Sequence, residues 1–137
     1  MGTLSNLSQY GVGFQIKVIH SLLNNKEFLI NIYDVLEPES FDNPAHKWLI
    51  EEIAQYYAKY HTTPTMDYFH GEVKKIANEV LKVSVVEQLR EAYKITNDDQ
   101  EYVEQEFSNF CKNQQLKNAI FQSIELLEKG DFDNIRG

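Results

Sequence analysis

The feature that most constrains this chain is how few residues that break helices occur in its second half. All three prolines precede position 65, and only six glycines are spread over 137 residues. All-β folds need turn residues of these kinds at short, regular intervals. The sequence therefore predicts an all-α fold with long helices. A chain of this length buries enough surface for one core, so we expect a single compact multi-helix domain.

Apolar residues three and four positions apart predict four helices in the first 80 residues. The first two are expected over residues 14–24 and 27–36, behind a flexible arm formed by residues 1–13. Asn43, followed directly by a proline, indicates the cap of a third helix. Thr65 is the expected cap of a fourth helix, with the apolar repeat Phe69, Val73, Ile76, Ala77 and Val80.

Two apolar stripes in the second half predict a protruding helical hairpin over about residues 78–112. The polar segment 96–99 between them has the composition of a turn with a helix cap. The second stripe continues without a breaker as far as Gly130, a residue type that often ends helices. We therefore expect one long C-terminal helix, with residues 130–137 beginning a linker.

The two stripes carry more apolar side chains than two helices can bury against each other. The remainder is expected to be exposed in a monomer, and exposed apolar patches mark association sites. A symmetric dimer through the hairpin is the resulting prediction. The expected subunit interface comprises Val83, Val86, Leu89, Tyr93, Tyr102, Phe107 and Phe110.

The charge balance argues against several classes of partner. The formal net charge is −8, and the 13 Lys and Arg residues form no basic stripe along the sequence. Such a chain repels phosphates, so we expect no direct nucleic-acid binding. No apolar run approaches the roughly 18 residues that span a membrane, and no secretion leader is recognisable. The sequence predicts a cytoplasmic protein without membrane attachment.

No catalytic motif is present. The chain lacks the phosphate-binding pattern G-x-x-x-x-G-K-[ST], the nucleophile pattern G-x-S-x-G and the zinc pattern H-E-x-x-H. Its four histidines are too far apart in sequence for a local metal pair. The lone Cys111 is expected to be a small buried hydrophobe. We therefore expect no catalytic residue, no metal site and no bound cofactor in this segment.

Several short segments resemble the N-terminal domain of DnaB-type replicative DNA helicases. Residues 18–25, VIHSLLNN, are similar to a first helix that ends in paired leucines and a polar turn. Residues 36–49, LEPESFDNPAHKWL, resemble the segment that leads into a helix near a histidine. Segments 110–114, FCKNQ, and 125–131, ELLEKGD, look closest to the helicases of T-even-like phages. The resemblance covers roughly residues 14–129 and includes no catalytic signature.

This resemblance implies a non-catalytic domain that assembles subunits and docks partners. In that family, hairpins pair between subunits into a collar above a hexameric ring of ATPase domains, and the collar takes part in contacts with primase and the helicase loader. ATP and Mg²⁺ would bind only in an ATPase domain beyond Gly137. An alternative is a free-standing acidic adaptor of phage origin, such as an inhibitor whose surface imitates DNA. A small metal-dependent enzyme is a third possibility.

Overall fold

The computed structural model describes residues 7–96 and 98–136, with Val12 and residues 130–136 described as backbone only. Every regular element in this part of the chain is helical, which confirms the predicted all-α class. The elements are η2 (Leu7–Tyr10), α1 (Val12–Asn24), α2 (Lys26–Ile32), η3 (Tyr33–Val35), η4 (Pro38–Ser40), α3 (Pro44–Tyr60), α4 (Met66–Val73), α5 (Glu79–Lys94) and α6 (Gln100–Arg136).

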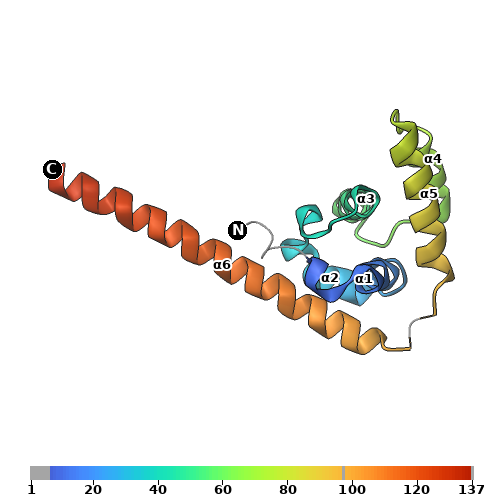
Figure 1. Ribbon diagram of the computed structural model, residues 1–137, viewed down its shortest axis with the longest axis horizontal. Coiled ribbons are helices and arrows are strands. Elements are labelled where there is room, and N and C mark those ends of the chain that lie inside the picture. Colours follow the sequence, from blue (N-terminus) through green and yellow to red (C-terminus); the bar gives the residue numbers. More distant parts are fainter. Residues whose placement is uncertain (1–6, 97, 137) are drawn as a thin grey trace.

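Helix α1 is the centre of the fold and packs against α3, α5 and α6. Val18, Ile19 and Leu22 lie three or four residues apart and are completely buried. Helix α3 adds Leu49 and Ile53 to the same core. Figure 1 shows α1 and α2 lying beside the first half of α6, with α3 on their other side. One hydrophobic core therefore joins elements from both halves of the sequence.

The start of the chain differs from the flexible arm that the sequence predicts. Leu7 is completely buried. The ring of Tyr10 stacks on Phe14, with 4.6 Å between centroids, and meets Phe110 edge-on. Gly11 precedes α1 with a φ of 87°, a value that glycine adopts without strain. The prediction is wrong for residues 7–13, because a few side chains anchor them; residues 1–6 lie outside the described part.

Side-chain caps begin the helices where the sequence predicts them. The Asn43 Oδ1 accepts a hydrogen bond from the backbone N–H of Ala45 at 2.8 Å, and α3 begins at the proline between them. The Thr65 Oγ1 accepts from the backbone N–H of Tyr68 at 3.2 Å and begins α4. Both caps satisfy a backbone donor that a helix start leaves free.

Helix α4 is shorter than predicted. It ends at Val73, and a turn then places Ile76 in the core. The Asn78 Oδ1 accepts from the backbone N–H of Leu81 at 3.1 Å and begins α5. A continuous helix through Val80 was expected from the apolar spacing alone. Asparagine competes with helix continuation by bonding to nearby backbone groups, and here it begins a new helix.

Helices α5 and α6 do not form the predicted hairpin. They diverge from their connecting segment (Figure 1), and both pack against α1, which lies between them. Val85 and Ala92 of α5, and Val103 and Phe107 of α6, are buried in the common core. The apolar stripes identified buried faces correctly, but a stripe does not specify which helix covers it. The helical hairpin over residues 78–112 is therefore a wrong prediction.

Helix α6 contains 37 residues and is the long C-terminal helix that the sequence predicts. It continues through Gly130, where the sequence indicated an end. A glycine within a helix costs only about 1 kcal/mol and does not by itself stop it. The first part of α6 lies against the helical body, and its second part projects away from it (Figure 1).

Candidate protein-docking surfaces

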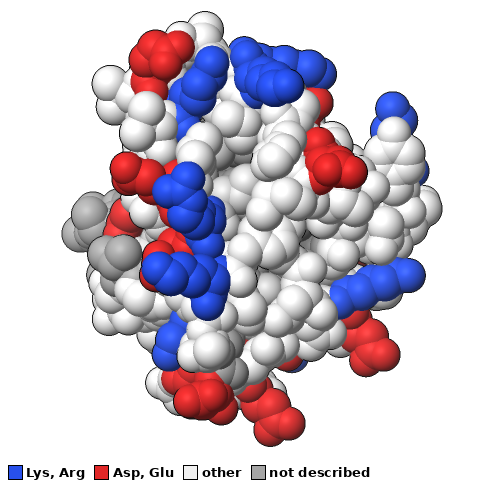
Figure 2. All heavy atoms as spheres, turned by 90° about the vertical axis from the view of Figure 1, so that its right-hand side faces the viewer, with Lys and Arg blue, Asp and Glu red and all other residues white. Residues whose placement is uncertain are grey.

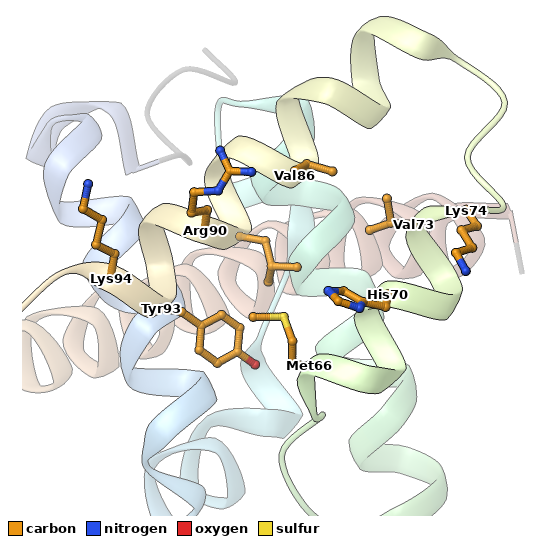
Figure 3. A pocket seen from close by; sticks show the side chains of 9 residues that line it. Met66, His70, Val73, Lys74, Val86, Arg90, Tyr93 and Lys94 are labelled. Carbon is orange, nitrogen blue, oxygen red and sulfur yellow. The ribbon is translucent and has the colours of Figure 1, made fainter.

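A groove with an apolar floor lies between α4 and α5. It has a volume of about 580 Å³. Figure 3 shows Met66 of α4 and Tyr93 of α5 facing each other across it. Leu89 is 5% exposed and forms part of the floor. The lining residues are Met66, His70, Val73, Lys74, Val86, Leu89, Arg90, Tyr93 and Lys94, and we call this site the α4–α5 groove.

Helical periodicity places these side chains on facing surfaces. On α4, Met66, His70 and Val73 follow one another at four and three residues and therefore share one side. On α5, Val86 and Tyr93 are seven residues apart, which is nearly two helical turns. The groove is thus built from two short helical faces that do not close completely over one another.

The charged residues at the groove are all basic. Lys74 lies on the α4 side and Arg90 and Lys94 lie on the α5 side, and the lining contains no aspartate or glutamate. Figure 2 shows Lys and Arg side chains gathered along one side of a largely uncharged area on this face. Residues 66–94 carry five basic and five acidic residues, whereas the rest of the chain carries eight and 16. The segment that contains the groove therefore has no net charge, whereas the rest of the chain has a net charge of −8.

The three cations at the groove are free of ion pairs to other described residues. Glu72 of α4 pairs with Lys75 in the turn that follows at 2.9 Å, and Glu79 pairs with Lys82 on α5 at 3.8 Å. Those carboxylates therefore already have partners on their own side. The positive charge of Lys74, Arg90 and Lys94 remains available to a ligand.

A second exposed apolar surface lies on the projecting part of α6. Its large side chains are between 46% and 66% exposed. At 100° per residue, they fall within roughly 80° of one another on one side of the helix. This side is turned by roughly 130° from the side that contributes to the core. It comprises Leu116, Ile120, Ile124 and Leu127, and we call it the α6 stripe.

The seven predicted interface residues are divided between surface and core. Val83, Val86 and Tyr93 are exposed on α5, and the latter two line the groove. Tyr102 is exposed on α6. Two predictions are wrong for this fold, because Phe107 and Phe110 are buried in the core. Leu89 is also a buried core residue, but one side of it lines the floor of the groove.

The apolar repeat of the α6 stripe is visible in the sequence, but its residues are not among the seven predicted interface residues. The length of this repeat could have indicated an interface, because a helix that extends beyond the width of one domain needs another partner to cover its apolar side. The groove had no comparable signal. It depends on how α4 and α5 meet in space, and α4 itself ends earlier than predicted.

A partly buried hydrogen-bonded pair and a buried thiol lie outside both surfaces. The Tyr68 hydroxyl donates to Oε1 of Glu52 at 2.7 Å, and burial raises the pKa of that carboxyl above its usual value. Cys111 is buried, as the sequence predicts, and burial raises the pKa of its thiol to about 12. Within the described residues, no three His, Cys, Asp or Glu side chains are placed to hold a metal ion.

The fold and its surfaces define a small all-helical protein with an apolar groove and a projecting amphipathic helix. None of the helices in the described part of the chain combines the length and the hydropathy needed to cross a membrane. Comparisons with protein families, curated proteins and solved structures find no match to this chain.

Proposed function

We propose that this chain is a non-catalytic assembly and partner-docking domain of a hexameric replicative DNA helicase of the DnaB type, acting in the cytoplasm. Subunits pair through the α6 stripe, and primase or a helicase loader docks on the helical body. The short segments that resemble this family support the proposal. The observation that carries it is the α6 stripe, four large aliphatic side chains exposed on a projecting helix.

Helical physics favours a partner for this part of α6. A helix without tertiary contacts is marginally stable in water, and most helices gain stability by packing an apolar face. The second part of α6 projects from the body that supports the first part. A second copy of the same stripe offers a complementary apolar surface, as in symmetric dimers. Pairing two α6 helices would cover both stripes at once.

The local charge also permits self-association. The whole chain has a net charge of −8, and like charges oppose the approach of two copies. Residues 116–129, which contain the α6 stripe, carry two lysines and two glutamates and therefore no net charge. Charge repulsion between two copies is therefore weak along the exposed stripe. This combination favours the stripe over the acidic parts of the surface.

Sedimentation equilibrium at tens of micromolar tests the assembly role. The unchanged chain should form dimers or larger oligomers, and the double variant Leu116→Asp, Ile120→Asp should remain monomeric. The matched control is Gln115→Asp, Gln122→Asp, which adds the same charge to exposed positions away from the stripe. Only monomer for the unchanged chain, or equal loss of association in both double variants, would overturn pairing through the stripe.

Sequencing the encoding gene tests the link to a helicase. A G-x-x-x-x-G-K-[ST] motif encoded downstream of Gly137 in the same reading frame would support the proposal. A stop codon directly after Gly137 would instead favour the alternative, a free-standing acidic adaptor. The two tests are independent, since an adaptor could also form dimers.

A further inference from the structure

We propose that the α4–α5 groove binds an acidic amphipathic helix from a partner protein. This inference rests on the docking role proposed above and specifies the chemistry of one partner. It is carried by the shape of the groove, by the sign of the charges around it, and by the absence of competing carboxylates from its lining.

The floor of the groove matches the apolar side of a helix. Val86 and Tyr93 line it about 10 Å apart along α5, since seven residues of a helix rise by that length. A bound helix with apolar residues at i, i+4 and i+7 repeats that spacing. Leu89 lies between the two and is almost fully buried, so the middle anchor meets a closed floor.

The basic residues at the edges of the groove favour an acidic partner. Lys74 on one side and Arg90 and Lys94 on the other would lie beside acidic residues that flank the apolar side of a bound helix. Exposed pairs contribute little affinity each, but they steer association and disfavour a ligand of the wrong sign. The rest of the chain has a net charge of −8, which on average disfavours binding of an acidic helix elsewhere.

A second copy of this chain fits the groove less well. The α6 stripe is apolar, but residues 116–129 have no net charge and so lack an acidic excess to meet three cations. The groove lining is also mainly apolar, whereas surfaces that bind nucleic acid combine cations with a polar path for phosphates. A second copy and a nucleic acid are therefore the competing occupants that the experiment must separate.

Fluorescence anisotropy with a labelled synthetic peptide tests the proposal. The probe is a helix-stabilised peptide with leucines at i, i+4 and i+7 and glutamates flanking them. Two control peptides have lysines in place of the glutamates or alanines in place of the leucines. We expect the probe to bind the full chain, and both controls to bind about tenfold more weakly or worse.

Groove variants must weaken binding of the same probe. We expect the double variant Arg90→Glu, Lys94→Glu to lower the affinity for the probe about tenfold or more. The single variant Val86→Asp should lower it by a similar factor. All three positions are exposed, and circular dichroism checks that each variant keeps its helices. The matched control is Lys26→Glu, Lys112→Glu, an equal charge change at exposed positions outside the groove, which should bind like the unchanged chain.

Besides failure of the probe to bind, three outcomes would overturn the inference. The first is equal binding of the acidic and the basic peptide. The second is loss of self-association in Val86→Asp together with displacement of the second copy by the probe, which would assign the groove to another copy of this chain. The third is binding of a single-stranded oligonucleotide that is lost in the double variant Arg90→Glu, Lys94→Glu and retained in Val86→Asp.

The stripe variant Leu116→Asp, Ile120→Asp separates this inference from the proposed function. It should bind the probe with unchanged affinity even when it is monomeric. If the unchanged chain self-associates but does not bind the probe, only the inference about the groove is overturned. Probe binding by a chain that never associates would overturn the assembly role alone.

Discussion

The imidazole of His46 on α3 donates its Nε2 hydrogen to the side-chain oxygen of Gln88 on α5 across 2.7 Å. An amide oxygen can only accept, so the neutral ring carries its proton on Nε2. The Nδ1 atom has no hydrogen-bond partner among the described residues, and the side chain is completely buried. A second proton would add a buried charge with an unpaired donor. Burial therefore lowers the pKa of His46, and the bond to Gln88 only partly opposes this.

The fold should lose stability as His46 is forced to take up a proton. The unfolded chain binds this proton near the usual histidine pKa of about 6.5, whereas the folded chain binds it only at lower pH. The contribution of His46 is therefore complete above about pH 6.5 and declines as the pH falls toward the lowered pKa of the folded state. Urea unfolding at about pH 7.5 and about pH 5.5 should show this decline, and His46→Gln should reduce it.

The contribution of Glu52 to the pH dependence of stability has the opposite sign. Burial raises its pKa, so the folded chain binds this proton at a higher pH than the unfolded chain does. The comparison is therefore best made with Glu52→Gln present in both chains. If stability falls equally between these two pH values in the chain with His46 and in the His46→Gln variant, His46 is not the source of the decline.

Two phenylalanines on α6 should differ sharply in their effect on stability. Phe107 is completely buried and contacts Phe28 and Phe41, with centroids 6.2 and 5.9 Å away, whereas Phe121 is 66% exposed. Phe107→Ala should lower the free energy of unfolding by about 3–5 kcal/mol. Phe121→Ala should change it by less than about 0.5 kcal/mol. Similar losses in urea unfolding would show that the two halves of α6 are packed alike.

The N-terminal segment should contribute to stability through Leu7. Its side chain is completely buried, so Leu7→Ala should lower the free energy of unfolding by about 2–4 kcal/mol. Gln9→Ala is the control, since Gln9 is exposed in the same segment and its loss should cost less than about 0.5 kcal/mol. Thermal unfolding of both variants measures the difference. No effect from Leu7→Ala would restore the flexible arm that the sequence predicts.

Asn78 should act as the cap that begins α5. Its side chain is exposed, so its effect reports the cap rather than core packing. Asn78→Ala should lower the free energy of unfolding by about 1 kcal/mol, and Asn78→Asp should retain most of it, because aspartate accepts the same hydrogen bond. A stabilising effect of alanine would instead indicate that α4 and α5 are one continuous helix.

The thiol of Cys111 should be unreactive in the folded protein. It is 3% exposed, and burial raises its pKa to about 12, so little thiolate exists at neutral pH. Ellman's reagent at about pH 8 should react only when the chain opens, and at once in guanidinium chloride. Fast reaction without denaturant would place Cys111 at the surface.

Local chemistry made several helix starts predictable. Asn43 and Thr65 each supply a side-chain acceptor beside an apolar repeat, and both caps lie where they were expected. The apolar spacing along α5 likewise included Val85 and Leu89, which are buried, although it also included Val86 and Tyr93, which are exposed. Such signals act within a few residues of one another, so they can be read along the chain.

The tertiary arrangement was not predictable in the same way. The apolar faces of α5 and α6 were assigned to each other, but both helices pack against α1, which also packs against α3. Phe14, Ile16 and Val18 of α1 are all buried in the common core. An apolar stripe indicates a helix face that is suited to burial, but it does not specify which element of the chain, if any, covers that face. The α4–α5 groove was missed for the same reason, since it is formed by two helices and depends on where α4 ends.

The continuity of α6 has a mechanical consequence. Its 37 residues make a rod about 55 Å long, with no described break between the end held against α1 and α2 and the projecting end. A partner that twists or tilts the α6 stripe cannot turn it independently, so the torque passes along the helix to Phe107 and the core. The angle at which two copies meet would thus set a strain on each body, and α6 would act as a lever.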